Sequence, residues 1–105
     1  MSDELHRQID QTVKSNRIVL FMKGNRAFPR CGFSAKVVDL LEQHETEFLD
    51  VDVLANPELK VGLKEYANWP TFPQLFVDGK LVGGCDIVTE LESSGELKPL
   101  LSPAQ

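Results

Sequence analysis

The sequence has few of the residues that build disulfide-stabilised or membrane-spanning proteins. It contains two cysteines, Cys31 and Cys85, which are too few for a secreted disulfide framework. Its longest apolar run, Ile18–Met22, is far too short to cross a bilayer. The first residues show neither the basic nor the apolar region of a secretion signal. We therefore expect a soluble protein of a reducing compartment, the cytoplasm, although an organelle-targeted mature form is also compatible with the sequence.

An excess of positive charge is also absent. The formal net charge is −5, which argues against nucleic acid as a partner, just as the short apolar runs argue against a membrane. One stretch reverses this balance: Lys23, Arg26, Arg30 and Lys36 surround Cys31 with no acidic residue between them. Such runs are usually solvated surface, but this one brackets the one cysteine in an unusual motif.

What is present fits one α/β domain over residues 1–105, long enough to bury a core without disulfides. Apolar residues at helical spacing predict helices near 5–13, 35–41, 57–67 and 87–91, and apolar runs predict strands near 18–22, 48–53, 75–77 and 81–82. Asp78-Gly79-Lys80 predicts a hairpin turn, and the prolines exclude 69–73 from a helix interior. The tail after Leu101 is expected to fray.

The order of these elements determines the expected topology. Strand, helix and strand in succession favour a parallel pair with a right-handed crossover, and the later hairpin adds two antiparallel strands. The result is a four-stranded mixed sheet with helices on both faces. That is the layout of a thioredoxin-like α/β domain.

The motif Cys31-Gly32-Phe33-Ser34 carries the most specific chemistry. Dithiol redox proteins have a second cysteine three residues on, but Ser34 cannot form a disulfide. Cys31 stands where a loop meets a helix, so the N–H groups of the first turn and the nearby cations are expected to lower its pKa. A thiolate is both a nucleophile and a metal ligand. The alternative is an inert, buried cysteine.

Four segments together resemble the monothiol glutaredoxins of the Cys-Gly-Phe-Ser class. The segments, which extend the resemblance from Arg17 to about Leu97, are Phe21-Met22-Lys23-Gly24, Pro29-Arg30-Cys31-Gly32-Phe33-Ser34, Asn68-Trp69-Pro70-Thr71-Phe72-Pro73-Gln74-Leu75 and Val82-Gly83-Gly84-Cys85-Asp86-Ile87. One departure is Asn25-Arg26-Ala27-Phe28, where the family often has a threonine and varied polar residues. This departure bears on partner contacts more than on chemistry.

The resemblance implies that glutathione binds beside Cys31. Its γ-glutamyl end would meet Asp86 and the amides after Gly84, its glycine carboxylate would meet Lys23 and Lys60, and Lys64 is a weaker third cation. Phe72 would pair with the tripeptide backbone through a cis bond to Pro73. The full set of expected ligand-binding residues is Lys23, Cys31, Gly32, Phe33, Lys60, Thr71, Phe72, Pro73, Gly84, Cys85 and Asp86.

The resemblance also implies a [2Fe–2S] cluster held by a homodimer. Such a cluster needs four ligands, and Cys31 plus one glutathione from each of two protomers supplies four sulfurs. The expected role is cluster delivery to iron–sulfur apo-proteins, with BolA-like proteins as further partners. Glutathione-dependent thiol–disulfide exchange is the alternative function, in which Cys31 is the catalytic nucleophile.

Cys85 and the two histidines leave further alternatives. Cys85 is either a small packing residue, which we prefer, or a cluster ligand or disulfide partner of Cys31. His6 and His44 lack ligand spacing and are expected at the surface.

Overall fold

The structure is a computed structural model, and it describes residues 1–103. The first helix, α1 (Asp3–Ser15), begins at an N-cap that the sequence supplies. The side-chain oxygen of Ser2 accepts a hydrogen bond from the backbone N–H of Leu5 at 3.1 Å. Ile9 and Val13 form the buried stripe of this helix, as their spacing predicts.

The central sheet has four strands in the order β2-β1-β3-β4. The first strand, β1 (Ile18–Met22), is buried along its whole length, because it pairs with parallel β2 (Leu49–Asp52) on one side and antiparallel β3 (Gln74–Val77) on the other. β4 (Lys80–Gly83) pairs antiparallel with β3. This topology confirms the mixed sheet expected from the sequence.

The hairpin between β3 and β4 follows from its two turn residues. Asp78 and Gly79 both have positive φ, 52° and 78°, which is the backbone of the two-residue turn that matches the twist of paired strands. Lys80, expected within the turn, is instead the first residue of β4.

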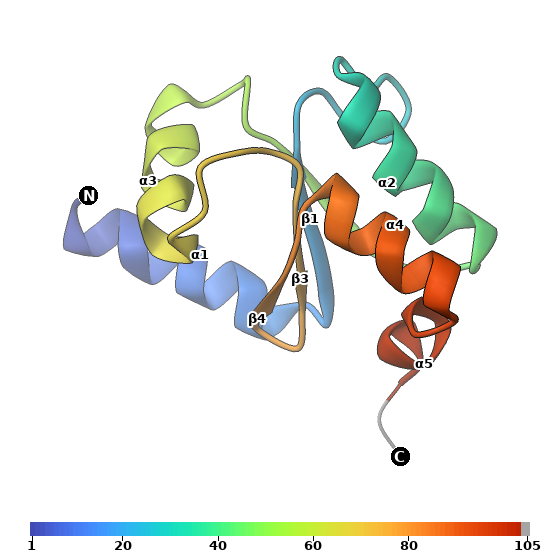
Figure 1. Ribbon diagram of the computed structural model, residues 1–105. Coiled ribbons are helices and arrows are strands. Elements are labelled where there is room, and N and C mark those ends of the chain that lie inside the picture. Colours follow the sequence, from blue (N-terminus) through green and yellow to red (C-terminus); the bar gives the residue numbers. More distant parts are fainter. Residues whose placement is uncertain (104–105) are drawn as a thin grey trace.

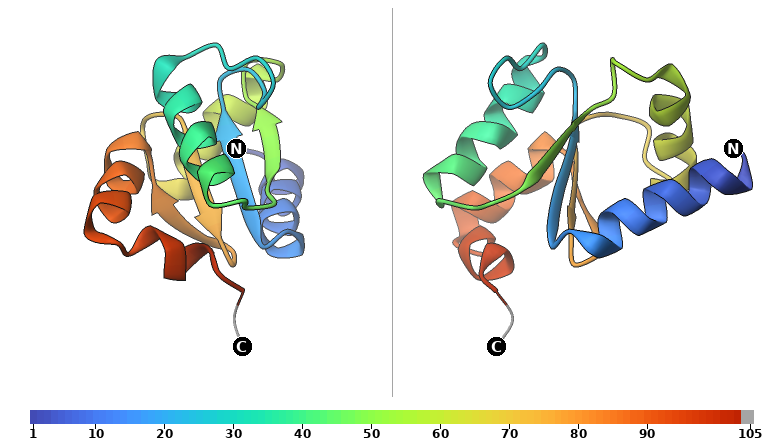
Figure 2. Two further views of the ribbon diagram at one scale, coloured as in Figure 1. Left: turned by 90° about the vertical axis from the view of Figure 1, so that its right-hand side faces the viewer. Right: turned by 180° about the vertical axis from the view of Figure 1, so that it is seen from behind.

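Helices cover both faces of the sheet, as Figures 1 and 2 show. α1 and α3 (Pro57–Ala67) lie on one face, and α2 (Gly32–Gln43), α4 (Cys85–Ser94) and α5 (Leu97–Leu101) lie on the other. Asn56 is the N-cap of α3, and its side chain accepts the N–H of Leu59; Asn68, in the left-handed conformation, is the C-cap.

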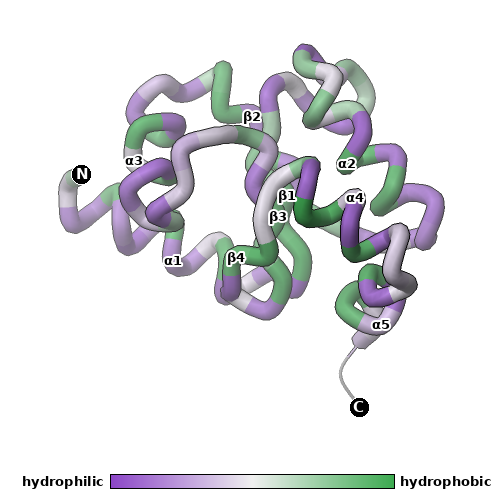
Figure 3. The backbone as a smooth tube through the Cα atoms, in the orientation of Figure 1, coloured by the Kyte–Doolittle hydropathy of each residue, from purple (hydrophilic) through white to green (hydrophobic). Residues whose placement is uncertain are grey.

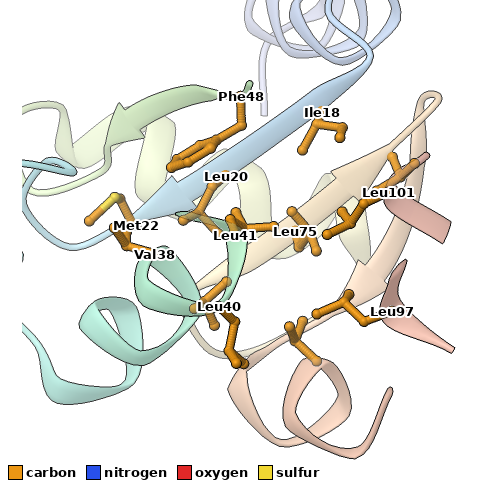
Figure 4. Close-up of a cluster of buried hydrophobic side chains, with 13 residues drawn as sticks. Ile18, Leu20, Met22, Val38, Leu40, Leu41, Phe48, Leu75, Leu97 and Leu101 are labelled. Atoms are coloured by element: carbon orange, nitrogen blue, oxygen red, sulfur yellow. The ribbon is translucent and has the colours of Figure 1, made fainter. Parts of the chain in front are cut away.

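Two apolar clusters hold these layers together. Along the chain, hydrophobic segments alternate with hydrophilic ones in α2 and α4, so each helix presents one apolar face to the sheet (Figure 3). In the larger cluster, Leu41 of α2 lies beside Leu20 and Leu75 of the sheet, whereas Leu40 lies on the side of α2 toward α4 (Figure 4). The smaller cluster, on the other face, includes Phe21 and Phe76 packed edge to face, with ring centroids 5.6 Å apart.

The structure also differs from the sequence prediction at β2 and at the C-terminal end. β2 contains neither Phe48 nor Val53; both are buried next to the strand, so their apolar character reflects core packing. The sequence pattern did not predict α5. It predicted fraying after Leu101, but Ser102 is held in place, because its carbonyl accepts a hydrogen bond from Arg17. Residues 104–105 of that tail lie outside the described residues.

Candidate functional site

A groove of about 610 Å³ opens at the end of the sheet where α2 and α4 begin. Its lining residues are Lys23, Cys31, Phe33, Lys60, Lys64, Trp69, Pro70, Thr71, Phe72, Gly84, Cys85, Asp86 and Ile87. Its volume is within the range of small-molecule sites. A hollow of about 720 Å³ near Arg17, His44 and Lys98 contains none of the predicted site residues.

The thiol of Cys31 enters this groove from the start of α2. Cys31 is the N-cap residue of α2 and is half-buried. The backbone N–H of Ser34 contributes most to lowering the pKa of the Cys31 thiol, and the N–H of Phe33, the charge of Lys23 and the Ser34 hydroxyl lower it further, against an opposing effect of burial. The direction of the pKa shift agrees with the expectation from the sequence, and the half-buried Cys31 at the groove is not part of the buried core.

Ser34 has a structural role that the sequence reading missed. Its side chain is fully buried, and its hydroxyl accepts a hydrogen bond from the backbone N–H of Lys23 at 3.1 Å. This bond ties the first turn of α2 to the end of β1. Because Cys31 caps the same turn, Ser34 fixes the position of the thiolate relative to Lys23.

Only one of the four cations around Cys31 in sequence affects its thiol. Lys23 lines the groove and lowers the pKa of Cys31. Arg26 points elsewhere: its guanidinium carbon lies 3.9 Å from the Phe48 ring centroid, and its Nε is 3.7 Å from Glu42. The expectation that the whole basic cluster lowers the pKa of Cys31 is therefore wrong.

The segment between α3 and β3 forms a second wall of the groove. Gln74, fully buried, donates from Nε2 to the carbonyls of Trp69 at 3.2 Å and Thr71 at 3.3 Å, and so fixes the backbone of this wall. The Phe72–Pro73 peptide bond is cis, as the resemblance implied.

The start of α4 forms a third wall, and two glycines shape it. Gly83 has φ of 148°, and a Cβ there would lie 2.7 Å from the Cδ1 of Ile87. At Gly84, a Cβ would lie 3.1 Å from the carbonyl oxygen of Pro73. The missing side chain at Gly84 therefore lets α4 approach the 69–73 segment closely. Asp86 is exposed in the first turn of α4.

Cys85 is a free thiol, like Cys31. It is half-buried and packs against the larger apolar cluster, with its sulfur 3.9 Å from the Oγ1 of Thr89. These contacts favour the packing role, while its place in the groove leaves the ligand role as a hypothesis.

The two histidines differ from each other. His6 is exposed, as expected, and its ring meets the Tyr66 ring edge to face. His44 is half-buried, and its Nε2 lies 2.7 Å from Glu92, which joins the end of α2 to α4. His44 is thus less exposed than the surface position expected from the sequence, because it packs against a partner that is far along the chain.

Most of the predicted ligand-binding residues line one groove. The exceptions are Gly32, which is exposed outside it, and Pro73, which is buried beneath it. The sequence reading missed Trp69, Pro70 and Ile87 as lining residues, although all three lie inside the motifs that carried the resemblance. Within residues 1–103, no group of three or more His, Cys, Asp or Glu side chains is placed to hold a metal ion.

The fold and the groove together define a protein class, and comparison with known proteins identifies it. The chain matches the Glutaredoxin family model over residues 18–82. It belongs to the glutaredoxin family, and its sheet order and helix layers confirm the thioredoxin-like fold.

Within that family, the chain is similar to monothiol members. It is 53% identical over 93 residues to a probable monothiol glutaredoxin 2 of Rickettsia felis, covering 89% of each chain. It is 49% identical over 104 residues to the chloroplastic monothiol glutaredoxin-S7 of rice, covering 99% of this chain but only 62% of that longer protein. The resemblance to the monothiol class is thus confirmed.

Solved structures agree with this assignment. Reduced poplar apo GrxS14 is 50% identical, with a TM-score of 0.80, and the match covers 90% of this chain and 87% of that one. A buckwheat glutaredoxin–glutathione complex is 27% identical, with a TM-score of 0.83, covering 96% and 94%. The holo form of poplar glutaredoxin C1 is 29% identical, with a TM-score of 0.84, covering 94% and 87%.

Proposed function

We propose that this protein binds glutathione in the groove beside Cys31 and uses it to carry a [2Fe–2S] cluster to other proteins. The observation that carries the proposal is a single thiol of lowered pKa at a ligand-sized groove, in a motif whose other sulfur position is a buried serine. The motif therefore supplies no second sulfur, and glutathione in the groove would supply one. The buckwheat relative was solved as a glutathione complex.

The charges of the groove match the two ends of glutathione. Lys23 and Lys60, with Lys64 as a third cation, suit the glycine carboxylate, and Asp86 suits the ammonium of the γ-glutamyl end. The N-terminus of α4, at Gly84, suits the γ-glutamyl carboxylate. The walls carrying Thr71 and Phe72 would hold the extended tripeptide between these ends.

The ligand count then requires two copies of the chain. A [2Fe–2S] cluster takes four ligands, but the described residues contain no group of three or more His, Cys, Asp or Glu side chains placed to hold a metal. Two Cys31 thiolates and two glutathione thiolates complete the set in a homodimer. Because half of these ligands are exchangeable small molecules, the cluster is suited to transfer, and iron–sulfur apo-proteins and BolA-like proteins are the proposed partners.

Glutathione-dependent thiol–disulfide exchange is the second candidate, favoured by the lowered pKa of Cys31. The Cys31 thiolate attacks the glutathione sulfur of a mixed disulfide, and the client thiolate leaves. A second glutathione thiolate then attacks the Cys31–glutathione disulfide. This step regenerates the Cys31 thiolate and releases glutathione disulfide.

The proposed compartment is reducing, because a glutathione-dependent thiolate requires it. None of the helices in residues 1–103 is long and apolar enough to cross a membrane. The cytoplasm predicted from the sequence remains the proposal, although the rice relative is chloroplastic.

Anaerobic reconstitution with iron, sulfide and varied glutathione tests the carrier role. We expect a coloured dimer that requires glutathione, is lost in Cys31→Ser and persists in Cys85→Ser, measured by absorption spectra and size-exclusion chromatography. A cluster that forms equally well without glutathione or any other small thiol contradicts the proposal. If no cluster forms while a glutathionylated peptide is turned over rapidly, the exchange function is the correct one.

A further inference from the structure

Two aromatic side chains beside Cys31 are exposed to solvent. Phe28 is 75% exposed and Phe33 is 62% exposed, the highest values among the exposed large hydrophobic residues. Phe33 borders the groove, but Phe28 contributes nothing to its lining. Single exposed apolar residues are common on protein surfaces, so the significance of Phe28 depends on how it is held.

Polar contacts hold the 24–30 loop that carries Phe28 in one conformation. The side chain of Asn25 accepts the backbone N–H of Phe28 at 2.9 Å. Two carboxylates of β2 hold the loop from below: Asp52 accepts the N–H of Gly24 at 3.0 Å, and Asp50 accepts the N–H of Arg26 at 2.9 Å. The exposed ring therefore stands on a braced support, and docking onto it costs little conformational entropy.

The same loop lies beside the first turns of α2 (Figures 1 and 2), and two of the cations in this part of the chain are free of ion pairs to the described residues, whereas Asp50, Asp52 and Glu42 are occupied by contacts with the loop. Arg30 and Lys36 are exposed and have no ion-pair partner within residues 1–103. The sequence from 23 to 38 contains no acidic residue, in a chain whose net charge is −5. We call Phe28, Arg30, Phe33 and Lys36 the aromatic rim.

We propose that the aromatic rim docks a client polypeptide that carries acidic and apolar side chains, and so presents the client's cysteine to Cys31. This inference rests on the proposed function, because it names the surface by which clients of that site are chosen. Phe28 and Phe33 supply apolar contacts, while Arg30 and Lys36 select negative charge. In the chain without a cluster, a second copy fits the rim less well than an acidic client, because no shared ligand would offset the approach of Arg30 and Lys36 to the same cations of the other copy.

Two synthetic peptides test the rim. Each carries one glutathionylated cysteine and one leucine, flanked by glutamates in one peptide and by lysines in the other. The Cys31→Ser chain prevents disulfide exchange, and Trp69, the single tryptophan, reports binding by fluorescence because it lines the groove. We expect the acidic peptide to bind about tenfold more tightly, and Phe28→Ala to weaken its binding about tenfold. Oxidised glutathione should bind equally to the Cys31→Ser chain with and without Phe28→Ala, because Phe28 does not line the groove.

Matched variants separate the rim from general surface effects. Arg30→Glu should reverse the peptide preference, whereas Lys80→Glu, at the hairpin far from the rim (Figure 1), should leave it unchanged. Val61→Ala is the control for Phe28→Ala, because Val61 is 61% exposed on α3.

The outcomes distinguish the rim from the glutathione site. If both peptides bind equally, or if Phe28→Ala does not affect binding of the acidic peptide, the proposal that the rim docks clients is overturned. If the Cys31→Ser chain binds no oxidised glutathione but still prefers the acidic peptide, the proposed function is contradicted and the rim is supported. Self-association that Phe28→Ala abolishes assigns the surface to a second copy and overturns the client.

Discussion

At the residue scale, the reactivity of Cys31 depends on groups within its own helix turn and on one lysine. The N–H of Ser34 makes the largest contribution to lowering the pKa of this thiol, and Lys23 adds a favourable charge. The thiolate is therefore stabilised by backbone geometry as well as by charge. Lys23 and Ser34 are coupled to each other, because the N–H of Lys23 is bound to the Ser34 hydroxyl.

This arrangement predicts how the reactivity of Cys31 changes with pH. The alkylation rate follows the thiolate fraction, so a lowered pKa places its rise at a lower pH than that of a free thiol, about 8.5. Lys23→Gln removes a favourable charge and should move the rise to higher pH. Iodoacetamide labelling followed by mass spectrometry measures both profiles.

Lys80→Gln, on the β3–β4 hairpin, is the control and should leave the profile unchanged. An identical profile for Lys23→Gln and the parent chain would show that the lysine charge does not act on Cys31.

The site residues show which single-residue roles can be predicted from sequence. The place of Cys31 at a helix start was predictable from local pattern, whereas that of Asp86 in the groove was predictable only from the family resemblance. The place of Arg26 was not predictable, because its ring contact with Phe48 depends on how β2 returns to the loop. The role of Ser34 was missed for the same reason, since its partner, the N–H of Lys23, is separated from it by a loop.

At the element scale, α5 depends on a residue distant in sequence. Arg17, just before β1, donates from Nη1 to the carbonyl of Leu101 at 2.7 Å and from Nη2 to the carbonyls of Leu100 and Ser102. These bonds satisfy carbonyls that a helix end leaves free. The five-residue α5 contains Pro99 and has no side-chain N-cap, so its own sequence gives little helix signal.

Removing this clamp tests its contribution. Arg17→Met should lower the free energy of unfolding by about 1–2 kcal/mol, because carbonyls at the end of α5 lose their donors. Hydrogen exchange should accelerate in α5, while glutathione binding stays unchanged, because Arg17 lies outside the groove. Urea unfolding and amide exchange are the measurements.

Arg7→Met is the matched control, since Arg7 is exposed on α1 and pairs only with neighbours on the same helix. Equal losses of stability in the two variants would contradict the clamp.

At the scale of the whole molecule, charge is distributed unevenly. The chain carries a net charge of −5, yet Lys23, Lys60 and Lys64 meet at one groove, and none of them forms an ion pair within the described residues. An anionic ligand is thus attracted by these local cations, whereas the protein as a whole repels it.

Lys60→Gln tests this local attraction. We expect its affinity for glutathione to fall about fivefold, the effect of losing one partly screened ion pair of about 1 kcal/mol. Raising the salt concentration should weaken glutathione binding to the parent chain more than to Lys60→Gln. Salt screens the Lys60 charge, which only the parent chain carries. Trp69 fluorescence or calorimetry measures both.

Lys80→Gln again serves as the control for a change in net charge alone. If it weakens glutathione binding as much as Lys60→Gln does, the long-range field determines affinity and Lys60 has no specific contact.

The two ends of the sheet limit how copies of this protein can associate. Its edge strands, β2 and β4, have four residues each; β2 carries Asp50 and Asp52, and β4 begins at Lys80. Short, charged edge strands disfavour pairing with a strand of another chain. Asp50 and Asp52 are also bound to the 24–30 loop, which anchors β2 to its own chain. Strand addition is therefore a poor route to dimers or aggregates, and copies that associate must do so through side chains and bound ligands.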